Sequence, residues 1–475
     1  MKDLNKFYIG GRWSEPSAGA QFADIVNPAT EEVVGRVAMA TSADVDCAVA
    51  AARAAFPAWS RTSVDVRAAL LGRVMALYKE RLGELADAIT TEMGAPVWLA
   101  REKQAPAGLG QLHGTLTALQ GFPFVTTRGS TQIVREPVGV AALITPWNWP
   151  LNQIAAKVAP ALAAGCTIVL KPSEITPLDA ALFAQIMHDA GVPAGVFNMI
   201  YGDGAEIGGA LARHRHVDMV SITGSTRAGV DVATKAAPTV KRVTQELGGK
   251  SPNVILDDAD LKSAVSNGVV FCMMNSGQTC IAPTRMLVPK HLHDAAAAIA
   301  AATANALTVG DPAHPDTKLG PISNRRQYER VQQMIQRGID EGATLAAGGA
   351  GRPAALARGF YARPTVFANV HNDMRIAREE IFGPVVVLIP YASEDEAIDI
   401  ANDTEYGLAA YVSSSDPARA RRVAQHLRAG AVMLNGAALD LNAPFGGYKM
   451  SGNGREFGEH GISEFLETKS IAGCV

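Results

Sequence analysis

Apolar runs alternate with amphipathic stretches through the middle of the chain. From position 140 onward, the runs VAALIT, CTIVL, FNMI and DMVSIT are separated by stretches with helical periodicity near 151–164, 177–190 and 205–213. Apolar runs without polar alternation are typical of strands that helices cover on both faces. The order of strands and helices therefore predicts a parallel, doubly wound α/β sheet.

A second alternating series runs from NVIL near Asn253 to VVVLIP, AAYVSSS and AVMLNG, with helical stretches near 261–274, 293–307 and 324–341. This order predicts another α/β unit. We place the boundary at Gly248 and Gly249, because paired glycines let the chain leave one unit for the next without steric penalty.

The stretch that precedes the first series, FPFVTTRGSTQIVREPVG, predicts two extended segments joined at 128–130. A two-stranded hairpin is only marginally stable by itself. We therefore expect it to pack on another subunit or domain.

Composition excludes several classes of protein. With 475 residues, 48% hydrophobic and 19% charged, the chain is expected to be a multidomain globular protein. Its net charge of -3 argues against nucleic acid or an anionic membrane as a partner and favours a small neutral or weakly charged one. The N-terminal segment lacks an apolar signal core, and prolines and polar residues interrupt the most apolar stretch, 140–170, so we expect a cytoplasmic protein without a transmembrane helix. Five cysteines without CxxC spacing predict neither disulfides nor a zinc site, and we predict no metal.

Cys280 is the cysteine whose context is least typical of a core residue. It ends the segment NSGQTC at 275–280, where small polar residues favour a tight, accessible loop. A lone cysteine is more often a small buried hydrophobe than a nucleophile. We expect a helix to begin after the thiol, and its N-terminus would favour the thiolate.

Glu246 lies in QELGGKSP, at the predicted end of an apolar strand and just before glycines that can admit a ligand. A single carboxylate at a strand end is usually only solvated. Paired with a thiol nucleophile, it could instead serve as the general base that a covalent mechanism requires.

Asn148 lies in TPWNWP, at the carboxyl end of the first predicted strand, where open α/β sheets bind ligands. Its amide could donate to an oxyanion on a thiol-bound intermediate. It could equally cap the helix that follows. The segment alone favours neither role.

Candidate nucleotide contacts follow the next strands. Lys171 and Glu174, in KPSE, could bind phosphate or ribose hydroxyls, and a carboxylate at Glu174 would repel a 2′-phosphate, which favours NAD over NADP. The glycine segments 202–208 and 224–229 lie between a strand and a helix, but neither is the GxGxxG fingerprint. Together they suggest a variant phosphate site, with Ser225 and the helix amides facing phosphate.

The ordered motifs TPWNWP, KPSE, ITGST, QELGGKSP, GQTC, EEIFGPV and PFGGYKMSG resemble those of the aldehyde dehydrogenase superfamily over essentially the whole chain. The resemblance implies the aldehyde dehydrogenase fold, with a Rossmann-like NAD-binding domain (1–121 and 140–248), an α/β catalytic domain (249–445) and a small β oligomerisation element (122–139 and 446–475). It also implies a homodimer or homotetramer.

The resemblance further assigns roles by position. Cys280 would be the nucleophile, Glu246 the base and Asn148 the oxyanion donor, with Lys157 and Glu456 as a proton-relay pair. Expected cofactor contacts are Thr145, Pro146, Trp147, Lys171, Ser173, Glu174, Gly204, Gly208, Gly224, Ser225, Gly229, Leu247, Glu380 and Phe382. Expected substrate contacts are Trp149, Asn152, Gln153, Ala156, Met274, Thr279, Ile281 and Leu439.

The implied reaction oxidises an aldehyde to the carboxylic acid through a thiohemiacetal and a thioester on Cys280, with NAD as cofactor and NADP less favoured. One alternative is a CoA-acylating relative, which would generally lack the carboxylate at Glu246. The other alternative is a catalytically silent structural relative. The aldehyde itself is not specified. The resemblance implies a wide tunnel, because Ala156 is small where many relatives carry a bulky aromatic residue. Among known subgroups, the chain resembles bacterial enzymes that handle aromatic or medium-chain degradation intermediates.

Overall fold

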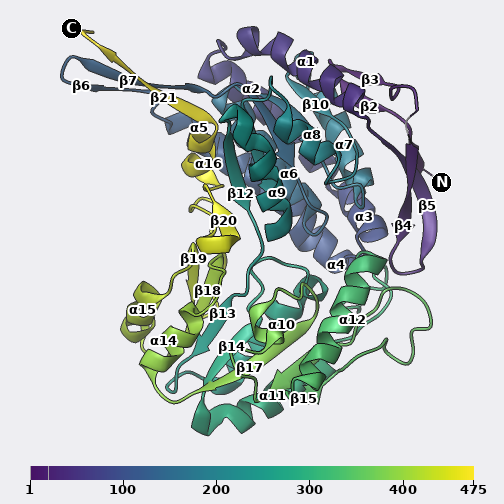
Figure 1. Cartoon of the computed structure of the whole chain (residues 1–475), viewed down its shortest axis with the longest axis vertical. Helices are drawn as coiled ribbons and strands as arrows, with labels where there is room; N and C mark the ends of the chain where they lie inside the picture. Colours follow the sequence, from purple (N-terminus) through teal and green to yellow (C-terminus); the bar gives the residue numbers. More distant parts are fainter. Residues whose placement is uncertain (1, 20, 475) are drawn as a thin grey trace.

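The computed structural model describes residues 2–19 and 21–474. The predicted domain limits at residues 1 and 475 lie outside the described residues. Two lobes, each built around its own sheet, stand one above the other, and a strand arm projects from the upper lobe (Figure 1).

The upper lobe contains an eight-stranded sheet, whose central strands are the apolar runs of the first predicted series. In spatial order the strands are β20 (Gly452–Asn453), β12 (Arg242–Glu246), β11 (Met219–Thr223), β8 (Val140–Ile144), β9 (Thr167–Lys171), β10 (Phe197–Met199), β2 (Phe7–Ile9) and β3 (Arg12–Ser14). The strands from β12 to β10 are parallel. β8 and β9 are buried throughout, as continuous apolar runs predict.

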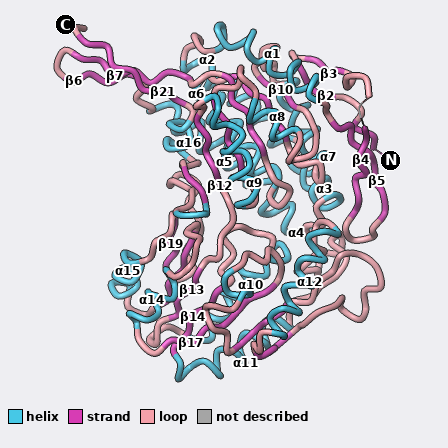
Figure 2. The backbone as a smooth tube through the Cα atoms, viewed as in Figure 1, coloured by secondary structure: helices cyan, strands magenta, loops and turns pink. Residues whose placement is uncertain are grey.

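Helices flank this sheet (Figure 2). They are α1 (Ser42–Trp59), α2 (Val64–Glu80), α3 (Leu82–Glu92), α4 (Val97–Leu99), α5 (Ala105–Gly121), α6 (Pro150–Ala164), α7 (Pro177–Asp189), α8 (Ile207–Arg213) and α9 (Thr226–Ala236), with a short η2 (Ala237–Thr239). A π-helical turn, η1 (Ala100–Gln104), connects α4 to α5. Pro150 starts α6, where its missing N–H has no helical partner to lose, and Gly165 ends the helix in the left-handed conformation.

The lower lobe contains a seven-stranded sheet, built from the second predicted series. In spatial order its strands are β15 (Thr344–Ala347), β16 (Thr365–Ala368), β17 (Val385–Tyr391), β14 (Arg285–Pro289), β13 (Pro252–Ile255), β18 (Ala409–Ser413) and β19 (Ala431–Leu434). Its helices are α10 (Leu261–Met273), η3 (Met274–Gly277), η4 (Lys290–Leu292), α11 (His293–Asn305), α12 (Arg325–Asp340), α13 (Arg375–Arg378), α14 (Glu394–Asn402) and α15 (Pro417–His426).

The predicted hairpin forms the arm. β6 (Val125–Arg128) and β7 (Thr131–Pro137) pair antiparallel, and the C-terminal β21 (Leu466–Ala472) adds to β7. In the rest of the C-terminal segment, β20 and α16 (Gly458–Glu464) contact the upper lobe, whereas η5 (Lys449–Ser451) also forms hydrogen bonds with residues 402–407 of the lower lobe. A separate three-stranded sheet joins β1 (Lys2–Leu4), β5 (Glu32–Met39) and β4 (Gln21–Asn27).

The predicted mixed α/β class is confirmed, with two mostly parallel sheets and a small β arm. The chain passes from the upper sheet to the lower between β12 and β13, where Gly248 and Gly249 lie. The division into three functional domains stays a prediction. In the described part of the chain, no helix is both long and apolar enough to cross a membrane.

Candidate active site

The strand β12 ends at Glu246, and the chain then runs close to the loop that carries Cys280. A β-carbon added at Gly249 would lie 2.7 Å from the carbonyl oxygen of Cys280. Only glycine allows the two backbones to approach so closely. The predicted base and nucleophile, far apart in sequence, therefore lie on adjacent segments where the lobes meet.

The loop before Cys280 is a strained turn. Asn275, Ser276 and Gly277 have φ values of +57°, +53° and +71°, a left-handed run that two non-glycine residues adopt at a cost. The expected helix after Cys280 is wrong: one turn position and a short irregular stretch lead from Cys280 into β14. No helix dipole therefore promotes the thiolate from that side, because β strands carry little net dipole.

Cys280 is partly exposed as a residue, but its thiol packs against an apolar cluster. Burial, reinforced by the carboxylates of Glu380 and Glu246, raises its pKa to about 12. The thiol is therefore protonated at neutral pH in this state and needs an acceptor for its proton before it can attack.

Glu246 is a buried carboxylate, and neither of its oxygens receives a hydrogen bond from the described residues. Burial first, and the charge of Glu456 second, raise its pKa well above the ordinary value. A β-carbon added at Gly446 would lie 2.6 Å from Glu246 Oε1, so the glycine leaves room for the carboxylate. A carboxylate with a raised pKa and free oxygens is suited to accept a proton near neutral pH.

Lys157 and Glu456 form a buried ion pair behind Glu246. The Lys157 ammonium also donates to Ser221 Oγ at 3.1 Å. Lys157 lowers and Glu456 raises the pKa of Glu246, which places both charges within its electrostatic reach. The structure thus brings the predicted relay pair to the predicted base.

Asn148 does not cap α6, whose N-cap position is Trp149. Its buried amide Nδ2 donates to the carbonyl of Gln278 at 3.0 Å, two residues before the nucleophile. An amide NH₂ has two donors, so this hydrogen bond uses only one of the two N–H groups of Asn148. Of the two roles left open by the sequence, this contact supports the oxyanion donor.

The residues of KPSE meet at the end of β9. The Lys171 ammonium donates to the carbonyls of Pro172 and Gly202 and to Glu174 Oε2, at 3.0, 2.8 and 3.3 Å. Ser173 Oγ accepts from the backbone of Ile175 instead of projecting freely. Lys171 thus holds Glu174, which stays partly exposed.

Ser225 and its neighbours form the start of α9. Ser225 Oγ caps the helix by accepting from Ala228 N, and Gly224 N donates to the carbonyl of Glu246 at 3.0 Å. A β-carbon at Gly229 would lie 2.7 Å from the side chain of Leu247. The predicted phosphate loop is therefore fixed directly to the segment of the base.

Glu380 and Phe382 reach this region from the lower lobe. Glu380 Oε1 accepts from Gly249 N at 3.1 Å, and a β-carbon at Gly248 would lie 2.2 Å from Glu380 Oε2. The Phe382 ring stands edge-on to that of Trp147, 5.5 Å between centroids. These contacts bring residues of both lobes together, an arrangement that suits a dinucleotide bound between them.

The remaining cofactor candidates differ in their surroundings. Thr145 N donates to the carbonyl of Lys171, so Thr145 and Pro146 begin the same loop as Trp147. A β-carbon added at Gly208 would lie 3.4 Å from the Cδ1 atom of Ile144, at the carboxyl end of β8. Gly204 is exposed, and a β-carbon added there would meet no atom within 4 Å.

The predicted substrate residues form two groups. Ala156, Ile281 and Leu439 lie with Cys280 in one apolar cluster, joined by the stacked rings of Phe445 and Phe457. The others contact the upper lobe: Trp149 Nε1 donates to Thr279 Oγ1 at 3.0 Å, Asn152 Oδ1 accepts from Gln111, Gln153 is buried in α6 and Met274 packs on the upper core.

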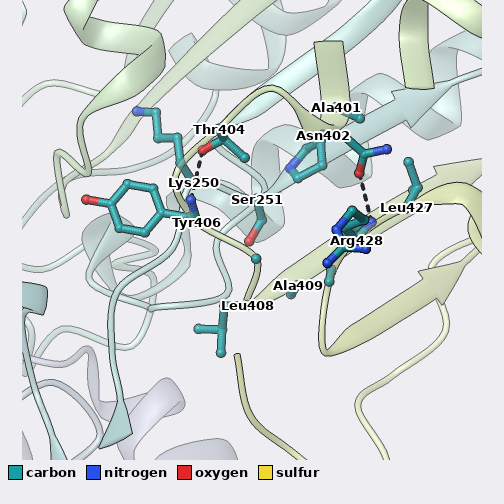
Figure 3. A pocket seen from close by; sticks show the side chains of 14 residues that line it. Lys250, Ser251, Ala401, Asn402, Thr404, Tyr406, Leu408, Ala409, Leu427 and Arg428 are labelled. Carbon is teal, nitrogen blue, oxygen red and sulfur yellow. Dashed lines mark hydrogen bonds between the residues drawn. The ribbon is translucent and has the colours of Figure 1, made fainter. Parts of the chain in front are cut away.

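A small cavity lies behind the segment that follows Gly249 (Figure 3), lined by Lys250, Ser251 and residues of 401–410 and 427–429. Its volume of about 10 Å³ is room for roughly one water molecule. Burial first, and Arg285 second, lower the pKa of Lys250 to about 7. The cavity is too small for an aldehyde, although Leu408 and Ala409 in its wall also belong to the apolar cluster around Cys280.

Several neighbours of the site were not singled out from the sequence. Ser221, Gln104 and Phe457 lie in a strand, a helix and a glycine-rich turn, where their residue types carry no local signal. Phe457 has a φ of +73°, which is unusual for a bulky residue, but backbone dihedrals cannot be inferred from its letter. Only the fold brings these residues to Cys280 and Lys157.

Comparison with known proteins gives a consistent result. The model of the family described as "Aldehyde dehydrogenase family" matches residues 13–471. A 3-succinoylsemialdehyde-pyridine dehydrogenase from a Pseudomonas species is 57% identical over 474 residues, 100% of this chain and 99% of that protein.

Solved structures agree. A mutant aldehyde dehydrogenase C from Pseudomonas syringae, complexed with NAD+ and octanal, matches with a TM-score of 0.98 and 57% identity, over 99% of this chain and 97% of that one. An aldehyde dehydrogenase from Mycobacterium tuberculosis, complexed with NAD+, matches with a TM-score of 0.97 and 42% identity, over 99% of this chain and 98% of that one.

Proposed function

The chain belongs to the aldehyde dehydrogenase family, and on this premise we propose that Cys280, Glu246 and Asn148 carry out its reaction. That reaction is the NAD-dependent oxidation of an aldehyde. One observation carries the assignment: three groups lie on neighbouring segments where the two lobes meet. They are the Cys280 thiol, the buried Glu246 carboxylate, which accepts no hydrogen bond from the described residues, and the amide of Asn148.

The proposed cycle begins at Cys280. Its proton passes to a base, for which the Glu246 carboxylate is suited, and the sulfur attacks the aldehyde carbon to form a C–S bond. The aldehyde oxygen becomes an alkoxide that accepts a hydrogen bond from the Asn148 amide. When bound, NAD+ supplies the acceptor for the hydride that leaves this carbon.

Loss of the hydride leaves a thioester on Cys280. Glu246 then removes a proton from water, whose oxygen attacks the thioester carbon. The C–S bond breaks, and the carboxylic acid leaves with the added oxygen while sulfur recovers its proton. We assign Lys157 and Glu456 to the onward transfer of the Glu246 proton, because their ion pair lies within its electrostatic reach.

The residues fit the dinucleotide. Between Gly248 and the Glu380 carboxylate there is a space that a β-carbon at position 248 would fill. At the end of β9, the Lys171 ammonium holds the Glu174 carboxylate. We propose that Glu174 binds the adenosine ribose, Glu380 the nicotinamide ribose, and the Ser225 end of α9 the diphosphate. A carboxylate at Glu174 favours NAD over NADP.

The experiment that tests the function measures NADH formation from octanal, with and without CoA. Aldehyde-dependent NADH without CoA, with octanoate as product, supports hydrolysis. NADH that requires CoA would indicate acyl transfer to CoA, and no NADH from any aldehyde would indicate a silent structural relative.

We propose apolar, medium-chain or aromatic aldehydes as substrates. The cluster around Cys280 is apolar and includes the small Ala156 and the stacked rings of Phe445 and Phe457. Two relatives are named for, or complexed with, such aldehydes: 3-succinoylsemialdehyde-pyridine and octanal. Each buried methylene adds about 0.8 kcal/mol, or roughly fourfold in kcat/KM. Within the n-alkanals, kcat/KM should therefore rise with chain length until the tunnel is filled, and succinic semialdehyde should be a poor substrate.

We also propose that the arm assembles the protein into a homodimer or homotetramer. The sheet of β6, β7 and β21 projects from the upper lobe (Figure 1), and Val125 and Ile471 are exposed on it. Apolar side chains on a projecting edge are typical of a surface that another subunit covers.

A further inference from the structure

A network of buried amides lies behind the nucleophile loop. Gln104 Nε2 donates to Asn275 Oδ1 at 2.9 Å. Asn275 Nδ2 donates to the carbonyls of Asn148 and Gln278, at 2.9 and 3.1 Å. All four residues are buried, so these hydrogen bonds do not compete with bulk water.

The direction of donation is fixed along this network. Two carbonyls accept from the same nitrogen of Asn275, so its oxygen must face Gln104. Gln104 must then present its nitrogen, because an oxygen there would oppose the oxygen of Asn275. The identity of the Gln104 donor thus determines how the Asn275 amide is oriented.

The network holds a strained segment. Asn275 and Ser276 adopt left-handed backbone conformations, and such strain persists only when surrounding contacts impose it. Ser276 Oγ donates to the carbonyl of Gly320 at 2.7 Å, and Gln278 Oε1 accepts from Ser323 N at 2.9 Å. Gln278 Nε2 donates to the backbone carbonyl of Asn275 at 2.9 Å, and Gln104 holds the side chain of the same residue.

Gln104 reaches the loop because of a π-helical turn. It is the last residue of η1, and the three residues before it, 101–103, are exposed. A π-turn inserts one residue into a helix and rotates the following face, a device common at functional sites. Here the rotation turns Gln104 inward, where its Oε1 has no hydrogen-bond partner among the described residues. That unsatisfied oxygen costs stability, which suggests that the donor atom is retained for another reason.

We propose that Gln104 is a positioning residue for the oxyanion donor. It orients Asn275, which anchors the backbone of Asn148 and the carbonyl of Gln278, the same carbonyl that accepts from the Asn148 side chain. Gln104 thereby sets where the free N–H of Asn148 points. This inference rests on the oxyanion role proposed above for Asn148.

The test is a double-mutant cycle. Gln104→Met removes the donor at similar length and should lower kcat about 10- to 100-fold, because small misplacements of a catalytic group cost up to about 10² in rate. KM for NAD should change less than about twofold. In an Asn148→Ala background the same change should cost less than about threefold, since a positioning effect needs the group that it positions.

Gln104→Glu gives an independent readout. At pH 8 the carboxylate cannot donate to Asn275, and kcat relative to the unaltered enzyme should be low. As pH falls, the protonated carboxyl can donate an O–H, so this ratio should rise between about pH 8 and pH 5. A ratio that stays constant with pH would count against the donor role, and it can be measured even if Gln104→Met does not fold.

Asn198→Leu is the matched control. Its buried amide makes three hydrogen bonds to backbone groups near β10, which β9 separates from the strand that leads to Asn148. Asn198→Leu should lower the melting temperature but leave kcat of the folded enzyme unchanged. If Gln104→Met lowered kcat equally with Asn148 and with Asn148→Ala, or did not lower kcat at all, the positioning role of Gln104 would be overturned while the proposed function would stand. A normal kcat for Asn148→Ala would instead remove the proposed oxyanion role.

Discussion

Cys280 and Cys272 are eight positions apart, yet their surroundings predict different consequences of substitution. Cys280→Ala should abolish NADH formation, while NAD binding, measured by calorimetry, stays within about threefold, because the thiol makes the covalent bond. Cys272 is fully buried in α10, and its thiol donates to the carbonyl of Val385. Cys272→Ala should therefore lower the melting temperature and leave kcat unchanged. Residual turnover in Cys280→Ala would exclude the proposed nucleophile.

Glu246→Gln should separate the two halves of the reaction. Without the base, about one NADH per site should form in a stopped-flow burst, and steady-state turnover should fall by about 10²–10⁴. Because the Cys280 pKa is raised to about 12, the burst should also slow if Glu246 accepts that proton. Mass spectrometry should detect the acyl adduct on Cys280. A variant with normal turnover would show that Glu246 is not the base.

The raised pKa of Glu246 also predicts how pH affects stability. The folded state holds the proton more tightly than the unfolded state, so stability is fully present below the unfolded pKa and is lost as pH rises through the folded pKa. Glu246→Gln should therefore be more stable than the parent at pH 8, by about 1–3 kcal/mol for a buried group without donors, and equal to it near pH 4. Denaturant titrations at both pH values measure the free energy of unfolding of the two proteins. If Glu246→Gln differed from the parent by the same amount at pH 8 and pH 4, the prediction would be contradicted.

Glu174 should set the cofactor preference. Its carboxylate is held by Lys171 at 3.3 Å, and it would repel a 2′-phosphate. NAD should give a higher kcat/KM than NADP. In Glu174→Gln, the ratio of kcat/KM for NAD to kcat/KM for NADP should fall roughly tenfold. Equal kcat/KM for the two cofactors in the unaltered enzyme would show that Glu174 does not face the ribose.

At the scale of an element, the left-handed turn before Cys280 depends on close packing. Gly277 and Gly191 have nearly the same φ, +71° and +72°, but a β-carbon at Gly277 would lie 2.0 Å from the carbonyl of Gly383, whereas one at Gly191 meets nothing within 4 Å. Gly191→Ala should cost about 1 kcal/mol from backbone strain. Gly277→Ala should cost more than about 3 kcal/mol and abolish activity, because the turn must move. Similar losses for both variants, measured in urea, would show that the turn can relax.

At the scale of the whole molecule, the arm is the proposed means of assembly. Ile471→Asp places a charge on β21 and should shift the protein toward smaller species in sedimentation velocity, because a buried unpaired charge opposes association. Leu345 is exposed to the same extent, 41%, on the edge strand β15, so Leu345→Asp is the control and should leave the assembly unchanged. An unaffected Ile471→Asp would place the interface elsewhere.

The sequence by itself determined the elements of both sheets, because their apolar runs and helical periods record which faces are buried. It also determined the family, through motifs whose order is visible without a fold. Glu246, Cys280 and Asn148 could be named in this way, since each lies in a local segment whose chemistry is readable.

Only the tertiary structure decided what these residues contact. A strand, not a helix, follows Cys280, and the Asn148 amide donates to Gln278 instead of capping α6. The Gln104 network and the burial of Glu246 depend on a π-turn and on glycines that let distant segments approach. Hydrogen bonds, pKa values and backbone strain arise from groups distant in sequence, so no local pattern along the chain could encode them.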